Sequence, residues 1–289
     1  MCFKGFRDGR PVSVVAVVLI AVMAGAVGIG AQATAPAPLP KGEPPKGAPA
    51  NPETSKSEAG KQDGELPAAR SIIDRHVKAV GGRDAILSHT SQHATGTFSV
   101  PAQGLTGSVE IFGAANPNRT ALRVQVPGLG EIASGYDGSH GWSISPLLGP
   151  MLQVGKELEQ AKFDADFYGD LRDPKRYRSM KTVEKTTFDN RPCYKVSLVR
   201  EDGSEDFDFY DASTGLRAGS MNTRETPMGS VKTTSIEGDY KKFGNLLLAT
   251  TVVQQIMGIE QKITLASIEF DKVPSSAFDL PAPIKALIK

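Results

Sequence analysis

From about residue 92 to residue 271 the chain repeats one pattern, in which apolar and polar residues alternate over short stretches that end in turn sequences. Leu122, Val124 and Val126 alternate with Arg123 and Gln125. A period of two residues puts the two sets of side chains on opposite faces of a β-strand. Few helical stretches separate these segments, so neighbouring strands must pair antiparallel, as hairpins.

Turn pairs such as Asp137-Gly138, Asp189-Asn190 and Gly244-Asn245 mark the ends of the strands. The pattern predicts strands at about 92–100, 106–114, 118–126, 130–137, 140–144, 180–188, 192–200, 205–211, 216–224, 230–240, 246–256 and 259–271. In the strand at 205–211 we expect Phe207 and Phe209 on the apolar face and Asp206 and Asp208 on the wet one.

Helical spacing occurs before the strands and once among them. Apolar residues between Leu66 and Val80 recur at three- and four-residue steps until Gly81-Gly82 ends the helix, and a short helix follows at 84–88. A segment at 146–175 interrupts the strands with an amphipathic helical pattern. The expected fold is mainly β with α (α+β): one highly curved antiparallel sheet, an unclosed β-barrel, with helices covering its concave face. Phe278 and Leu280 would tuck the C-terminus against it.

Before the folded part lie two other kinds of sequence. Residues 1–33 combine a basic start, an apolar run and Ala31-Gln32-Ala33, which is typical of a cleaved signal peptide. The alternative is an uncleaved N-terminal membrane anchor. Residues 34–65 are expected to form a disordered Pro-rich linker, either a stiff tether or a passive tail. The domain at 66–289 is therefore expected in the periplasm, and an uncleaved leader would tether it to the inner membrane.

Charge and cysteine content exclude several functions. Lys and Arg number 33 against 32 Asp and Glu, so the net charge of +1 provides no basic field for nucleic acid. Only Cys193 lies outside the leader, which leaves no internal disulfide. We expect Cys193 to be a buried packing residue rather than a nucleophile.

Four short motifs resemble LolA-like and LolB-like carriers, grouped with outer membrane lipoprotein-sorting proteins. They are Val80-Gly81-Gly82 after the first helix, Tyr136-Asp137-Gly138-x-x-Gly141-Trp142, the turn Asp239-Tyr240-Lys241-Lys242-Phe243-Gly244-Asn245, and the closing Phe278-Asp279-Leu280-Pro281. The resemblance implies an unclosed β-barrel whose apolar hollow holds the acyl chains of lipoproteins or other lipids. It also implies that envelope membrane proteins could be partners.

A hydrophobic ligand is also expected on physical grounds. A strongly curved sheet encloses more volume than its own side chains readily fill, so helices or a ligand must occupy it. Leu147, Leu148, Met151 and Leu152 form an apolar patch at a Gly149-Pro150 hinge, which suits a movable lid. The candidate ligand-binding residues are Phe98, Ile111, Leu122, Val124, Trp142, Leu147, Leu148, Met151, Leu152, Phe163, Phe167, Tyr194, Val196, Phe207 and Phe209.

No catalytic motif accompanies this pattern. His89 and His93 are four residues apart, but they straddle a helix end and a strand start without an obvious third metal ligand. We therefore expect no enzyme, no metal and no cofactor, and a monomer. The favoured function is an extracytoplasmic carrier or sensor of acyl chains. The alternatives are an envelope scaffold with a filled core and a hydrolase marked by a histidine beside Ser, Cys or a carboxylate.

Overall fold

The computed structural model describes residues 65–226 and 229–289, which form a single 13-stranded antiparallel sheet. Its strand order is β6-β5-β4-β3-β2-β1-β13-β12-β11-β10-β9-β8-β7. The strands are β1 (Ser91–Val100), β2 (Leu105–Ala114), β3 (Arg119–Val126), β4 (Gly130–Tyr136), β5 (Gly141–Ser145), β6 (Gly149–Gln153), β7 (Tyr177–Phe188), β8 (Arg191–Arg200), β9 (Glu205–Asp211), β10 (Arg217–Thr226), β11 (Gly229–Phe243), β12 (Leu246–Ile256) and β13 (Ile259–Phe270).

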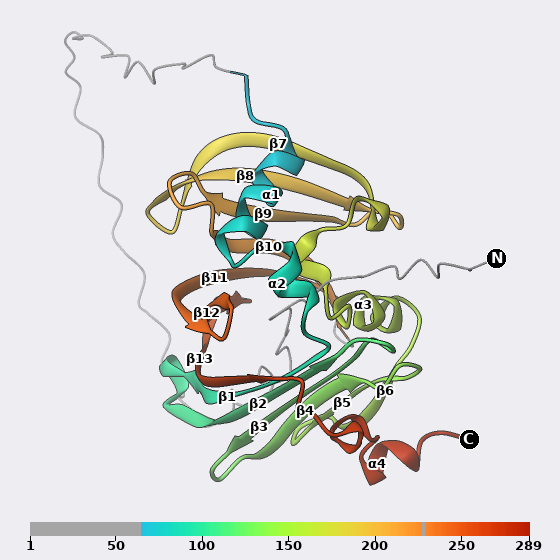
Figure 1. The fold of residues 1–289 in the computed structure, drawn as a ribbon. Helices are drawn as coiled ribbons and strands as arrows, with labels where there is room; N and C mark the ends of the chain where they lie inside the picture. Colours follow the sequence, from blue (N-terminus) through green and yellow to red (C-terminus); the bar gives the residue numbers. More distant parts are fainter. Residues whose placement is uncertain (1–64, 227–228) are drawn as a thin grey trace, which may run out of the picture.

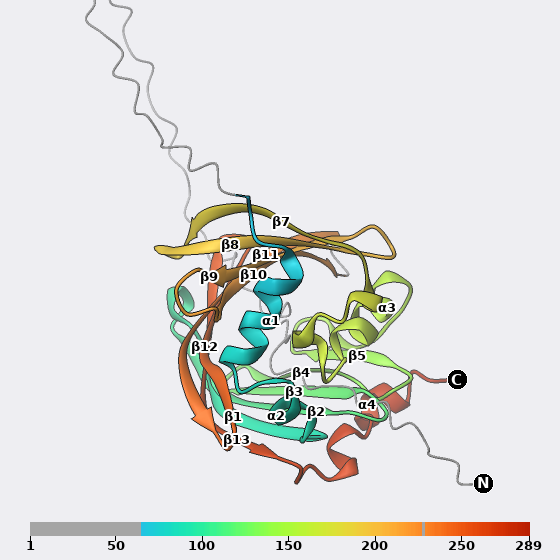
Figure 2. The same cartoon turned by 45° about the horizontal axis from the view of Figure 1, so that its top comes forward.

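The helices are short. They are α1 (Ala69–Ala79), α2 (Arg83–Leu87), α3 (Lys156–Asp164) and α4 (Ala282–Lys285), with 3-10 turns η1 (Pro101–Gln103), η2 (Gly169–Leu171), η3 (Pro174–Arg176) and η4 (Ser275–Phe278). The sheet curves around α1, and α3 lies at its open side (Figures 1 and 2). Strands β6 and β7 end the sheet without pairing with each other. The predicted fold, one unclosed antiparallel sheet with helices on its concave side, is confirmed.

The expectations of a movable hinge and of a helical start in the segment at 146–152 are wrong. Gly149–Gln153 is an edge strand, because every residue from Gly149 to Gln153 has a partner on β5. The expected hinge at Gly149-Pro150 is therefore part of the sheet, and Leu147 and Leu148 lie in the preceding turn with about half of their surface exposed. The helix of the interrupting segment begins only at Lys156.

The C-terminus of helix α1 is fixed to the turn between β11 and β12. Gly81 has a φ of 128°, and a Cβ there would lie 2.5 Å from the carbonyl oxygen of Asn245. This close approach lets the N–H of Leu247 donate to the carbonyl of Val80 at 2.9 Å. The Gly81-Gly82 pair thus ends α1 and also lets the β11–β12 turn pack against it.

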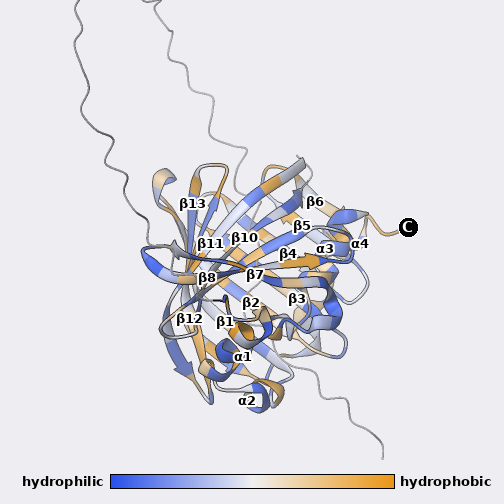
Figure 3. Cartoon of the chain, turned by 90° about the horizontal axis from the view of Figure 1, so that it is seen from above, coloured by the Kyte–Doolittle hydropathy of each residue, from blue (hydrophilic) through white to orange (hydrophobic). Residues whose placement is uncertain are grey.

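Hydrophobic and hydrophilic residues are interspersed along the strands (Figure 3), and some apolar residues lie on the convex face. The C-terminal segment covers part of this face. Phe278 packs with Phe112 and Ala121, and Ile284 packs with Ala133 and Trp142. The chain therefore has small cores outside the curve in addition to the main core inside it.

Candidate binding site

One wall of the hollow is apolar. It is formed by the concave face of β1 to β4, where Ile111 pairs with Leu122, and Val124 with Val109 and Ile132. These residues and Phe98 are all at most 2% exposed and belong to the main core. Because directly paired residues point to the same side of a sheet, the wall is continuous across the strands.

Helix α1 occupies the space in front of this wall and beside the opposite one. Ile72, Ile73 and Val77 lie on its buried face and belong to the main core. His76 lies on the same face, 5% exposed, and its Nδ1 accepts a hydrogen bond of 3.2 Å from the backbone N–H of Arg217. Burial, reinforced by the charge of Arg217, lowers the pKa of His76 from 6.5 to about 4. The imidazole is therefore neutral at physiological pH.

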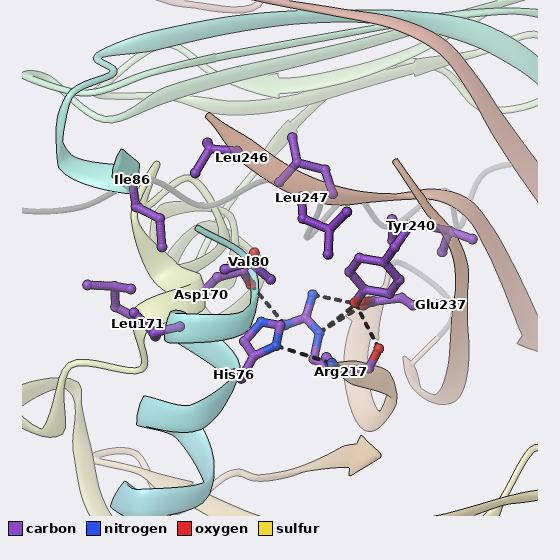
Figure 4. A pocket seen from close by; sticks show the side chains of 14 residues that line it. His76, Val80, Ile86, Asp170, Leu171, Arg217, Glu237, Tyr240, Leu246 and Leu247 are labelled. Atoms are coloured by element: carbon purple, nitrogen blue, oxygen red, sulfur yellow. Dashed lines mark hydrogen bonds and ion pairs between the residues drawn. The ribbon is translucent and has the colours of Figure 1, made fainter. Parts of the chain in front are cut away.

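The opposite wall, on β9 to β11, is charged. Arg217 pairs with Glu237 and Asp170, each at 2.8 Å, and Arg172 pairs with Asp208 at 2.7 Å. Asp208 and Glu237 are 1% and 6% exposed, so these are buried ion pairs. Figure 4 shows the Arg217 side chain between Glu237 and the helix that carries His76.

Two buried carboxyl groups of this wall are affected in opposite directions. Burial opposes the ionisation of Asp208, but the charges of Arg172 and Arg217 outweigh it and hold its pKa below the usual value. At Glu237 burial is the stronger effect and raises the pKa despite the neighbouring Arg217. The wall therefore keeps its charges only because arginines lie within ion-pair distance.

A cavity of about 40 Å³ lies where α1, the charged wall and the β11–β12 turn meet (Figure 4). Its apolar lining includes Val80, Leu171 and Leu246, and its polar lining includes Arg217 and Glu237. A single water needs roughly 10–15 Å³ of such space, so the cavity has room for a few waters. A long acyl chain would need α1 or the segment after β6 to move.

The segment 156–176 covers the hollow from its open side. Phe167, Tyr168 and Leu171 anchor it in the main core, whereas polar interactions hold α3. No residue of α3 is buried. Asp164 pairs with Arg224 of β10 at 2.7 Å, and the Arg70 side chain of α1 donates to the carbonyls of Leu171 and Arg172. Beneath this cover lies a second cavity, of about 60 Å³, lined by residues of β8 to β12 and by Phe163 and Asp164.

The structure brings together some of the residues predicted from the sequence. The following belong to the main core or pack against it: Phe98, Ile111, Leu122, Val124, Phe163, Phe167, Tyr194 and Val196. Met151 is half-buried on edge strand β6, while Leu147 and Leu148 are 51% and 49% exposed. Whether any of these residues contacts a ligand stays a prediction.

Four predicted residues face away from the hollow, so their expected inward placement is wrong. Trp142 and Leu152 pack with Ile284 of the C-terminal helix on the convex face. Phe207 and Phe209 belong to another separate cluster, with Phe188 and Cys193. The physical reason is that both faces of these strands bury apolar surface, so hydropathy does not identify the inner one.

The charged wall is the part of the site that the sequence reasoning missed. Asp206 and Asp208 were expected on the wet face, but they point into the hollow, where Arg200 and Arg172 neutralise them. The missed residues on the neighbouring strands are Arg217 and Glu237. The alternation along this strand is as predicted, but the face that was expected to meet solvent lines the hollow.

The residues considered for other chemistry have structural partners. His89 Nδ1 lies 2.7 Å from Asp271, and its Nε2 lies 2.9 Å from the side-chain oxygen of Asn245, so both ring nitrogens are already bonded. His93 instead lies 3.3 Å from Glu110. Within residues 65–226 and 229–289 no group of three or more His, Cys, Asp or Glu side chains could hold a metal ion. Burial raises the pKa of the Cys193 thiol, which suits a packing residue.

The hollow of this open antiparallel sheet has one apolar wall and one charged wall. Several solved structures are similar to the chain. No family model matches the sequence, and no curated protein is similar to it. A LolA superfamily protein from Nitrosomonas europaea has a TM-score of 0.48 at 13% identity, over 74% of this chain and 99% of that one. A putative outer membrane lipoprotein-sorting protein domain from Vibrio parahaemolyticus has a TM-score of 0.48 at 13% identity, over 73% and 95%.

A DUF1329 family protein from Desulfovibrio piger gives a TM-score of 0.46 at 12% identity, over 74% of this chain and 98% of that chain. These three structures are thus similar to this chain over about three quarters of its length, at TM-scores below 0.5. As for membrane insertion, none of the helices in the described part of the chain is long and apolar enough to cross a bilayer.

Proposed function

We propose that this protein is an extracytoplasmic carrier or sensor that holds an apolar chain of a lipid or lipoprotein in the hollow of its sheet, without catalysis. The observation that carries the proposal is the continuous apolar wall on β1 to β4, which faces a cover attached by ion pairs. Each buried methylene of an acyl chain would contribute about 0.8 kcal/mol, so a long chain could bind strongly without polar contacts.

The cover is suited to movement. Hydrogen bonds exchange for water at small net cost, whereas apolar packing does not. Helix α3 contributes no buried residue to the core. Displacement of α3 would therefore open the hollow from the side between β6 and β7, while Phe167, Tyr168 and Leu171 keep the rest of the segment anchored in the main core. The expected location outside the cytoplasm rests on residues 1–33, which lie outside the described residues, as do residues 34–64 of the linker.

Uptake of methyl palmitate by delipidated protein tests the proposal. The informative variant is Val124→Thr, which adds a hydroxyl to the apolar wall where Val124 is fully buried. If the hollow opens to water before the acyl chain enters, the chain would leave this hydroxyl without a partner at a cost of about 1 kcal/mol, so we expect affinity to fall roughly fivefold. Val199→Thr is the matched control, because Val199 pairs with Ser179 and Glu205 on the convex face. Equal affinities in the two variants would contradict binding at this wall.

A second function, an envelope scaffold or interaction module with a filled core, is favoured by one observation. Helix α1 and the ion pairs of Arg172 and Arg217 already occupy much of the hollow. This alternative predicts that neither the delipidated wild-type protein nor its variants take up methyl palmitate. It also predicts that protein purified from its native envelope carries no lipid in intact-mass spectrometry.

A further inference from the structure

One part of the hollow is neither apolar nor charged. On the concave faces of β10 to β13, uncharged polar residues occupy adjacent register positions. Asn222 pairs with Thr233, Ser220 with Ser235, and Gln254 with both Ser235 and Gln261. We call this set the amide patch, defined by Ser220, Asn222, Thr233, Ser235, Gln254 and Gln261. Paired residues have Cβ atoms about 4.5–5.5 Å apart, so the patch is continuous.

The amide patch is buried, and part of it has no hydrogen-bond partner. Gln261 is 1% exposed and Thr233 is 2% exposed. Neither the Oε1 nor the Nε2 of Gln261 has a protein partner, and the hydroxyl of Thr233 has none. A buried polar group left unpaired costs roughly 1–3 kcal/mol, so something that forms hydrogen bonds is expected beside these side chains.

Gln261 points into the hollow. It alternates with Ile263 and Leu265, two residues of the main core, on the same face of β13. The cavity of about 60 Å³ is lined by Ser220, Asn222, Ser235 and Gln254. These residues are register neighbours of Gln261 and Thr233, so the cavity lies next to the two unpaired side chains. Ile263, two residues after Gln261 on the same face of β13, pairs with Phe98 of the apolar wall. An apolar chain and a polar group could therefore lie end to end across this boundary.

The charges around the cavity indicate which polar group would fit. Every arginine that lines it is paired with a carboxylate: Arg172 with Asp208, Arg176 with Asp166, Arg200 with Asp206, Arg217 with Glu237 and Arg224 with Asp164. No cation of the cavity lining is left over for a phosphate or carboxylate. The unpaired groups of Gln261 are uncharged: its amide NH2 can donate hydrogen bonds and its amide oxygen can accept them.

We infer that the hollow takes an amphipathic lipid whose acyl chain meets the apolar wall and whose uncharged hydroxyl, ester or amide groups hydrogen-bond Gln261 and Thr233 in the amide patch. This inference deepens the proposed function and depends on it. A plain hydrocarbon chain across the patch would leave Gln261 unpaired, so the patch selects against it. A charged headgroup would find no free counter-charge in the cavity lining.

Binding of three ligands to delipidated full-length protein tests the inference: 1-palmitoylglycerol, with free hydroxyls, methyl palmitate, with no donor, and palmitate, with a charge. Wild-type protein should prefer 1-palmitoylglycerol over each of the others by roughly tenfold, from about 1.4 kcal/mol of hydrogen bonding. In Gln261→Leu this preference should disappear, because affinity for 1-palmitoylglycerol falls more than affinity for methyl palmitate, whose ester can only accept a hydrogen bond. Gln255→Leu, an exposed position of β12, is the matched control and should keep the preference.

The outcomes separate the two proposals. If methyl palmitate and 1-palmitoylglycerol both fail to bind, the proposed function itself is contradicted. If all three ligands bind alike, or if Gln261→Leu keeps the preference, acyl-chain binding stands and the inference is overturned. Should Gln261→Leu only raise the stability to urea without changing the preference, the amide patch holds water rather than a ligand group. Thr233→Val, a smaller change, provides a second variant in case Gln261→Leu misfolds.

Discussion

Arg217 is the residue on which the charged wall depends. Its guanidinium pairs with Asp170 and Glu237, and its backbone N–H donates to His76. The phenol of Tyr240 donates in turn to the Arg217 carbonyl at 2.8 Å. One residue thus connects α1, the turn η2 and strands β10 and β11. Its contribution is large because removing one partner of a buried pair leaves the other charge without compensation.

Replacement of Arg217 by leucine should therefore destabilise the fold strongly. Glu237 and Asp170 would lose the cation that compensates their burial, at a cost of about 3–5 kcal/mol. Urea unfolding followed by circular dichroism measures the change. Lys272→Ala is the control, because Lys272 is 75% exposed and its 3.9 Å contact with Glu269 should contribute less than about 1 kcal/mol. A loss for Arg217→Leu no larger than that of the control would show that the pair is not needed for stability.

His76 makes stability depend on pH in a defined window. Its pKa is about 4 in the folded protein and 6.5 when unperturbed, so only the unfolded chain binds a proton there between these values. Stability is complete above pH 6.5 and declines as the pH falls toward 4. At pH 5 the loss from this residue should be about 2 kcal/mol.

Urea unfolding at pH 7 and pH 5 measures this effect in wild type and in His76→Gln, whose side-chain oxygen can still accept from the Arg217 N–H. The variant should lose less stability than wild type between the two pH values. An equal loss in both proteins would assign the pH dependence to the carboxyl groups instead.

At the scale of elements, α3 is attached to the sheet without apolar burial of its own. It contacts β10 on one side of the opening and β4 to β6 on the other, without a buried residue of its own. Local stability follows apolar burial, so elements of this kind open before the sheet does. The proposed entry route for a ligand requires this difference in stability between cover and sheet.

Amide hydrogen exchange should detect the difference. We expect the amides of α3 to exchange through local opening, at a lower free energy than those of β1 and β13 in the centre of the sheet. Arg224→Gln removes the pair with Asp164 and should lower the opening free energy of α3 by about 1–3 kcal/mol. Lys232→Gln, at an exposed position of β11, should leave it unchanged. Exchange of α3 only upon global unfolding would argue against a movable cover.

The sequence predicts elements better than it predicts which face of an element is buried. Strand β9 was located at its observed bounds, yet Asp208 is 1% exposed and Phe207 lies outside the curve. Alternation gives two faces, and the arginine that neutralises Asp208 comes from η2, far away in the sequence. Strand β6 was missed because Gly149-Pro150 is typical of a turn, and proline is tolerated in a strand only at a sheet edge. That edge position depends on tertiary structure.

At the scale of the whole molecule, the unclosed sheet leaves two edges that could pair with another copy. The edge strand β6 has five residues and includes Pro150, which has no N–H to donate. The other edge, β7, is longer, with register irregularities between Tyr177 and Ser179 and between Thr182 and Glu184. Exposed Lys181 and Lys185 lie on it. Bulges and lysines on an edge strand oppose edge-to-edge pairing, which supports the expectation of a monomer.

Removal of these lysines should therefore allow the protein to associate. The double variant Lys181→Val, Lys185→Val presents a longer β-branched edge on which only Arg178 and Glu184 are charged, and strand addition across β7 would satisfy its free backbone groups. We expect sedimentation velocity to show concentration-dependent dimers or larger species for this variant and monomers for wild type. Lys232→Val, Lys241→Val places the same change at exposed positions of β11, a strand that lies inside the sheet between β10 and β12, and this variant should remain monomeric. Association of both variants alike would mean that hydrophobicity alone causes it, and that the lysines of β7 do not protect the edge.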